Sequence, residues 1–215
     1  KRKSDKIKDA CQYYAKAFEL SPDDNVVLNS YAQAISRLGD YKRADELFKK
    51  ALAVGSDNTH NKHLIINHTS IAENLRKWAN SLINDREYDN AISKIQNALK
   101  SVKEVLRIDK YDIKGNILYR NILYTYGIIE EKRSNFDEAI RYFKIITELS
   151  YDRYKEMEIY TRACLELAEI YIGRKEYEQA KRYITKDIEK NIKRIDKVSF
   201  SEKQKKIQET IQEEL

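Results

Sequence analysis

Four times along the chain, an aromatic residue stands three positions before an alanine. Another small residue stands twelve positions before each of these alanines. The four sets are Tyr41/Ala44 with Ala32, Tyr88/Ala91 with Ala79, Phe136/Ala139 with Gly127, and Tyr177/Ala180 with Ala168. Around them, apolar residues recur at the three- and four-residue spacing of one helix face. The pattern therefore predicts a helix–turn–helix unit that is repeated along the chain.

The stretch Leu28–Ser56 shows this unit most clearly. Two apolar stripes are separated by Gly39-Asp40, which combine a residue suited to a left-handed helix end with a good N-cap. The first stripe consists of Leu28, Tyr31, Ala32, Ile35 and Leu38, and the second of Tyr41, Ala44, Leu47, Phe48 and Ala51. The small side chains of Ala32 and Ala44 predict that the two helices cross closely.

The pattern L-x2-Y-A-x2-I-x3-GDY-x2-A-x3-F-x2-A, which runs from Leu28 to Ala51, resembles a tetratricopeptide repeat. Upstream, a stretch matches the second helix of a preceding repeat, at Ala10, Tyr14, Ala17 and, in the turn between repeats, Pro22. The spacing of 34 residues from Ala10 to Ala44 equals the usual period of the family. The first helix of that preceding repeat is missing, so we expect the sequence to be a fragment of a longer protein.

The resemblance implies an all-α fold, a right-handed α-solenoid of antiparallel helix pairs. We expect the array to cover residues 1–198, with a partial unit at 1–22 and units at 25–56, 60–108, 115–150 and 154–197. The spacing between successive alanines grows from 34 to 47, 48 and 41 residues, which predicts helices of roughly 18–24 residues in the later units. In the last unit, Asp187 replaces an apolar residue, so we expect its outer face to pack differently or to meet solvent.

After Lys197 the sequence predicts one more helix, at 199–215. Ser201 with Gln204 fits a capping box, and Phe200 fits a hydrophobic staple. Apolar residues then follow at four-residue spacing, at Ile207, Ile211 and Leu215. We expect this helix to cap the array, because a last repeat otherwise leaves its apolar side bare. The alternative is a helix that continues toward a further domain or a dimer partner.

Composition supports a helical protein. Among 215 residues there are only 5 glycines and 1 proline, and 35% are charged. The formal net charge of +6 is mildly basic and lacks the dense positive footprint of a dedicated nucleic-acid binder. Two distant cysteines without a motif, Cys11 and Cys164, indicate a reducing compartment, so we expect a cytoplasmic location. No apolar run approaches 18 residues, so we expect no membrane helix.

We find no sequence pattern for catalysis or for a cofactor. His60, His63 and His68 lie close together, but their spacing does not place all three on one helix face, and no cysteine is near, so we expect no metal site. Phosphate-binding glycine loops, nucleophile elbows and HExxH motifs are absent from the sequence. We therefore predict that the chain is not an enzyme and needs no cofactor.

The resemblance implies that the first helix of each unit lines a concave groove, with the side chains off its packing stripe pointing into that groove. These side chains are Asn29, Gln33, Arg37, Arg76, Lys77, Asn80, Asn84, Asn121, Tyr124 and Arg162. Amides can bond a peptide backbone, and arginine or lysine can bond carboxylates. We therefore predict a protein-interaction scaffold that binds a peptide or partner protein there, as the docking or sensing part of a larger protein.

Two other binding modes follow from the same residues. Some family members clamp a peptide's C-terminal carboxylate, and Arg76, Asn80 and Arg162 resemble parts of that clamp, whereas Thr125 and Glu166 do not fit it.

The alternative function is binding of RNA or single-stranded nucleic acid, for which 16 tyrosines and the basic balance would supply stacking and phosphate contacts. Most of those tyrosines, however, fall on the packing stripes.

Overall fold

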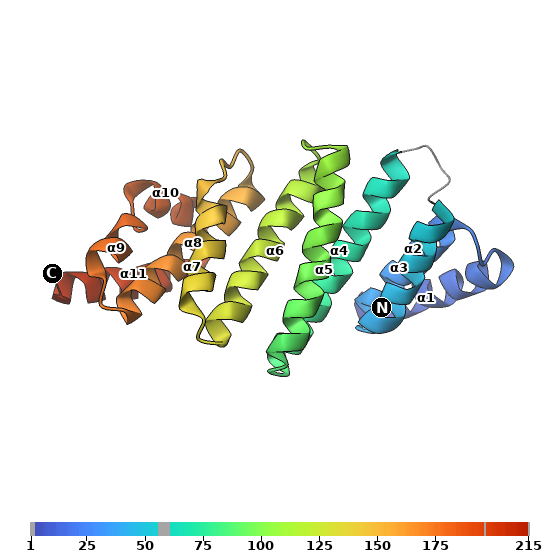
Figure 1. Ribbon diagram of the computed structural model, residues 1–215, viewed down its shortest axis with the longest axis horizontal. Helices are drawn as coiled ribbons and strands as arrows, with labels where there is room; N and C mark the ends of the chain where they lie inside the picture. The colour runs from blue at the N-terminus through green and yellow to red at the C-terminus, as the bar shows by residue number, and fades with distance from the viewer. Residues whose placement is uncertain (1–2, 56–60, 196, 215) are drawn as a thin grey trace. The chain divides into compact units, whose positions relative to one another are not determined.

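The computed structural model describes residues 3–55, 61–195 and 197–214, and its regular structure in these ranges is α-helical, without a β-strand (Figure 1). The prediction of an all-α protein is confirmed. The helices are α1 (Lys3–Leu20), α2 (Asn25–Arg37), α3 (Tyr41–Gly55), α4 (Asn61–Asn84), α5 (Tyr88–Ile108), α6 (Ile113–Lys132), α7 (Phe136–Glu148), α8 (Tyr154–Gly173), α9 (Tyr177–Arg182), α10 (Lys186–Ile195) and α11 (Val198–Glu214). They form two compact units, Lys1–Ile122 (unit 1) and Leu123–Leu215 (unit 2), and α6 begins in one and ends in the other. None of the described helices is both long and apolar enough to span a bilayer.

Consecutive helices pack as pairs, and Figure 1 shows α4 and α5 lying antiparallel and side by side. The small residues that the repeat pattern singled out are buried at these crossings, and their alanines have no exposed surface. They are Ala32, Ala44, Ala79 and Ala91 in unit 1, and Gly127, Ala139, Ala168 and Ala180 in unit 2. Because alanine and glycine have little or no side chain, the helix backbones approach closely and larger residues such as Phe48 and Phe143 fill the space beside them.

The turn inside each pair has one backbone feature in common. The residue five positions before the second-helix alanine has a positive φ, at Gly39 (92°), Arg86 (62°), Ser134 (63°) and Lys175 (60°). At the last three, the following amide donates to a carbonyl five residues back, as from Glu87 to Leu82 at 2.8 Å, which is the Schellman pattern of a helix end. Glycine occupies this position only once, so three turns hold an ordinary residue in a left-handed conformation.

The expected helix lengths hold for some of the later helices and fail for others. With 24, 21, 20 and 20 residues, α4, α5, α6 and α8 lie in the expected range. The prediction is wrong for α7, with 13 residues, and for α9, with 6. The helix after Tyr177 stops at Arg182 and restarts as α10, where Ile188 N donates to Thr185 Oγ1. Asp187 therefore lies exposed in the first turn of α10, which favours a negative charge.

Helix α11 packs on α8 and α9. It buries Phe200, Ile207 and Ile211, which is the arrangement that a terminal cap requires, and the capping role stays a prediction. The predicted capping box at Ser201 is wrong, because the helix begins at Val198 and the Ser201 amide already donates to the carbonyl of Lys197 within the first turn.

Candidate binding groove

In unit 1, α2 and α4 are joined by a row of polar side chains. Asn29 Nδ2 donates to Asn67 Oδ1 at 2.7 Å, and Gln33 Nε2 donates to Asn29 Oδ1 at 2.6 Å. Ser70 Oγ lies 3.2 Å from both Asn29 Oδ1 and Gln33 Nε2. Asn29 and Asn67 are buried, so the Asn29 amide fixes the register of the two helices and has little surface to offer a ligand.

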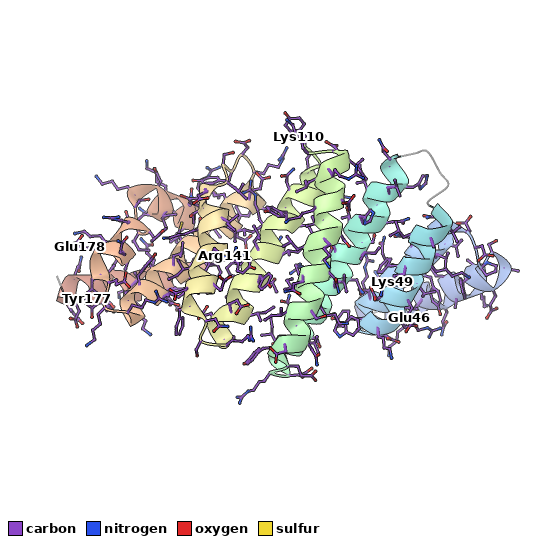
Figure 2. The ribbon with its side chains drawn as sticks, viewed as in Figure 1. Glu46, Lys49, Lys110, Arg141, Tyr177 and Glu178 are labelled. Atoms are coloured by element: carbon purple, nitrogen blue, oxygen red, sulfur yellow. The ribbon has the colours of Figure 1, made fainter. Side chains whose placement is uncertain are left out.

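Next to this row lies a cavity of about 890 Å³, which we call the unit-1 groove. Its walls come from the end of α2, the inner face of α4, and the α5–α6 connection with the start of α6, which Lys110 marks in Figure 2. Several apolar side chains that line the groove keep exposed surface, namely Ile66 with 41%, Ile113 with 49% and Tyr111 with 76%. A binding partner that covered these side chains would gain hydrophobic stabilisation.

Some charged side chains of the unit-1 groove have hydrogen-bond or ion-pair partners, and others have none among the described residues. Asp109 and Asp112 accept hydrogen bonds from the backbone amides of Tyr111 and Gly115, which organises the connection into α6. Lys77 Nζ lies 3.1 Å from Glu73 Oε1. The other cations that line the groove form no ion pair or hydrogen bond through their side chains with any described residue. These are Arg37, Lys62 and Lys114.

Two polar side chains of α4 that line the groove have unmet hydrogen-bonding capacity. Asn74 is 1% exposed, and its Nδ2 donates to the Tyr41 carbonyl at 3.1 Å. Its Oδ1 accepts no hydrogen bond from the described residues, and Thr69 Oγ1 has no partner there either. Both atoms are buried, so a ligand in the groove does not reach them, and an unpaired buried polar atom costs about 1–3 kcal/mol.

Other residues that the sequence suggested on α4 lie apart from this groove. Asn80 and Asn84 are exposed near the end of the helix and do not line it. Arg76 is half-buried, its Nε has no partner among the described residues, and burial lowers the pKa of its guanidinium. Asn121, on α6, donates from Nδ2 to the Ile117 carbonyl of its own helix at 3.0 Å. Of the predicted set, the structure thus gathers Gln33, Arg37 and Lys77 around one cavity.

The predicted residues of unit 2 bond to neighbouring side chains. Tyr124 Oη donates to Glu166 Oε1 at 2.7 Å, and burial, together with that carboxylate, raises the pKa of Tyr124. On α11, Lys203 Nζ lies 2.6 Å from Glu166 and 2.8 Å from Glu169. Arg162 donates to Glu158 at 2.8 Å and lies over the ring of Phe200. These polar groups therefore spend much of their bonding capacity on holding α6, α8 and α11 together.

Sequence reasoning missed much of the unit-1 groove. The lining residues outside the predicted set are Ser36, Phe48, Lys62, Ile65, Ile66, Thr69, Ser70, Glu73, Asn74, Asp109, Tyr111, Asp112, Ile113 and Lys114. An apolar stripe continues upstream of Leu75, at Leu64, Ile65, Ile71 and Ala72, and the first half of α4 lines the groove. The contribution of the α5–α6 connection had no sequence signal, because it depends on how α6 is placed against α4.

Within the described ranges, no three His, Cys, Asp or Glu side chains are grouped as a metal site requires. His60 lies outside these ranges. His68 is half-buried, and burial lowers the pKa of its imidazole.

Comparison with known proteins agrees with this architecture. Residues 161–189 match the family model described as tetratricopeptide repeat. The crystal structure of MamA superposes with a TM-score of 0.51 at 18% identity, over 92% of this chain and 99% of that one. MamA 41-end from Desulfovibrio magneticus RS-1 superposes with a TM-score of 0.49 at 15% identity, over 89% of this chain and 88% of that one. Pseudomonas aeruginosa PilF superposes with a TM-score of 0.47 at 19% identity, over 85% of this chain and 67% of that one. No curated protein sequence gave a significant match.

The matched repeat and the MamA-like fold define the class as an α-solenoid of tetratricopeptide-repeat type. Residues 161–189 match that family and the fold is similar to that of MamA, so the tetratricopeptide-repeat resemblance of the sequence is confirmed. Proteins of this family generally bind other proteins, and the fold is typically a non-catalytic interaction scaffold.

Proposed function

We propose that the chain is an interaction scaffold whose unit-1 groove binds an extended peptide segment of a partner protein. One observation carries this proposal: the groove combines exposed apolar side chains with three cations that form no ion pair with any described residue, Arg37, Lys62 and Lys114. A peptide in extended conformation offers both carboxylates that pair with such cations and side chains that cover Ile66 and Ile113.

We further propose that the chain is the docking or sensing part of a larger protein and that it carries out no catalytic step. Cys11 and Cys164 are both free thiols, which suits a reducing, cytoplasmic location.

Nucleic-acid binding has weaker support. Tyr31, Tyr126, Tyr142 and Tyr171 are buried and therefore unable to stack on bases. The groove also contains three carboxylates that would repel a phosphate backbone, on Glu73, Asp109 and Asp112.

The test is selection of linear peptides from a random phage-displayed library on the purified chain, followed by fluorescence polarisation with the enriched peptides. The variant Ile66→Asp places a charge in the groove, and Val26→Asp is its control, because Val26 is an exposed valine of α2 (59%) that does not line the groove. Loss of binding in Ile66→Asp alone, with unchanged circular dichroism and melting, supports the proposal. Enriched peptides that bind both variants like the wild type would contradict it.

A further inference from the structure

A second cavity of about 780 Å³ adjoins the unit-1 groove between α1 and α2, and we call it the α1–α2 cavity. The two cavities share Gln33, Ser36, Arg37 and Lys77, so a single ligand can pass from one to the other. The remaining lining of the α1–α2 cavity comes from Lys6, Ile7, Ala10, Tyr14, Ser30, Ala34 and Tyr41.

The two cavities differ in charge. Lys6, Arg37 and Lys77 line the α1–α2 cavity, and none of the carboxylates in the described ranges does. The side chains of Lys6 and Arg37 form no ion pair with any described residue, and only Lys77 has a partner, Glu73 of its own helix. The unit-1 groove, in contrast, mixes cations with three carboxylates and exposes apolar side chains. Anionic groups are therefore favoured at one end of the path only.

This asymmetry excludes a uniform polyanion as the best ligand. A nucleic-acid strand that entered at Arg37 would next meet Glu73, Asp109 and Asp112, whose carboxylates repel its phosphates. A peptide can place carboxylates at one end, aliphatic side chains at the other, and backbone N–H groups throughout. The tyrosine rings of Tyr14 and Tyr41 add an apolar wall for the methylene groups of an acidic side chain.

We infer that the ligand of the groove is an acidic–aliphatic peptide segment, whose aspartate or glutamate side chains bind Lys6, Arg37 and Lys77 in the α1–α2 cavity while its aliphatic side chains cover Ile66 and Ile113. This inference rests on the proposed function and adds the composition and the polarity of the segment. Its acidic end lies toward α1, and its aliphatic end lies toward the start of α6.

The experiment uses the highest-affinity peptide from the phage selection, labelled with fluorescein, and two altered versions of it. In one version each Asp and Glu is replaced by Asn and Gln, and in the other by Lys. The protein variants are Arg37→Glu and Lys6→Glu, with Lys100→Glu as a charge-matched control, because Lys100 is exposed on α5 and lines neither cavity.

We expect the enriched peptides to contain acidic residues, and the amide version to bind the wild type roughly fivefold or more weakly. Arg37→Glu should weaken binding of the acidic peptide more than Lys100→Glu does. It should strengthen binding of the lysine version, because the reversed charge pair restores attraction. Doubling the salt concentration should weaken the acidic peptide more than the amide version.

Two results would overturn the inference while leaving the proposed function intact. The first is a set of Ile66-dependent peptides without acidic residues, and the second is equal binding of Arg37→Glu and Lys100→Glu to the acidic peptide. The inference would also be overturned if a 12-nucleotide poly-U RNA bound more tightly than the acidic peptide and its binding depended on Arg37. If no enriched peptide depends on Ile66, the proposed function fails and the inference fails with it.

Discussion

Gly127 lies so close to the ring of Phe143 that a β-carbon at position 127 would stand 2.5 Å from Cε1 of that ring. Both residues are buried in unit 2, where α6 meets α7. The other units have alanine at the equivalent crossing, at Ala32, Ala79 and Ala168. In this unit the aromatic ring therefore takes the space of the missing methyl group.

We predict that Gly127→Ala destabilises the protein, although alanine is the better helix former. Overpacking of a core costs about 1–3 kcal/mol, against about 1 kcal/mol that alanine gains over glycine in a helix. In a Phe143→Leu background the ring is gone, so the same substitution should become neutral or stabilising. Urea unfolding of the two single variants and the double variant measures this change of sign. Equal effects of Gly127→Ala in both backgrounds would show that the ring does not limit the crossing.

The turns inside the helix pairs allow the opposite experiment. Arg86, Ser134 and Lys175 hold positive φ at exposed positions, where the left-handed conformation costs an ordinary residue about 1 kcal/mol. We predict that glycine at any one of them raises the free energy of unfolding by up to that amount, because glycine has no β-carbon to clash. Lys132→Gly, just before the same turn in the helical region, is the control and should destabilise.

A lower melting temperature for the glycine variants than for the wild type would contradict this account of the turns. Gly39→Ala completes the comparison. It introduces a β-carbon at φ 92°, where no neighbouring atom lies within 4 Å, so any loss of stability reports the backbone conformation alone.

The fold was predictable because its information is local. A small residue twelve positions before an alanine identifies each crossing, and Ala79 with Ala91 shows that insertions between units leave this spacing intact. The early ends of α7 and α9 were not predictable from the apolar stripe. After Arg182, Ile184 continues the stripe, yet the chain turns and Thr185 starts a new helix.

The groove was less predictable, because helix periodicity gives the face of a helix and not the register between helices. Asn29 falls off the apolar stripe of α2, as a groove residue should, but it pairs with Asn67, which is 38 residues away. Asn74 is buried for the same reason, since α4 packs against α3 as well as α2. Arg37 and Lys77 line the cavity, because long cationic side chains reach it from either helix, and their role in binding stays a prediction.

Unit 2 contains a half-buried carboxyl group, that of Glu131, whose pKa is raised. Burial, and then the charge of Glu166, raises the pKa of Glu131 above its usual value of 4.5, while Lys132 and Lys203 oppose the shift. The folded state therefore binds a proton more tightly than the unfolded chain does. The contribution to stability is greatest at low pH and is lost as the pH rises from 4.5 through the raised pKa.

We predict that Glu131→Gln is more stable than the wild type at pH 7, because the amide has no charge to bury, and that its stability falls less steeply over that pH range. Thermal melts from pH 4 to pH 8 measure both effects. Glu178→Gln, an exposed glutamate of α9 labelled in Figure 2, is the control and should follow the wild-type profile. Parallel profiles for all three proteins would contradict the assignment.

The attachment of α11 depends on Lys203, which is 22% exposed between Glu166 and Glu169. Burial alone would lower the pKa of Lys203, but the two carboxylates outweigh it and raise that pKa, so the ion pairs persist until the pH exceeds the usual 10.5 of lysine. We predict that Lys203→Met costs about 1–3 kcal/mol at pH 7, since it leaves Glu166 partly buried without its cation. It should also raise the pKa of Glu131 further, so that the melting temperature falls more steeply with pH than in the wild type.

Lys205→Met is the matched control, because Lys205 is exposed on the same helix and lies 3.7 Å from Glu209, and it should have little effect. If both methionine variants melt alike, α11 is held by Phe200, Ile207 and Ile211 alone, and its ion pairs add nothing to the packing.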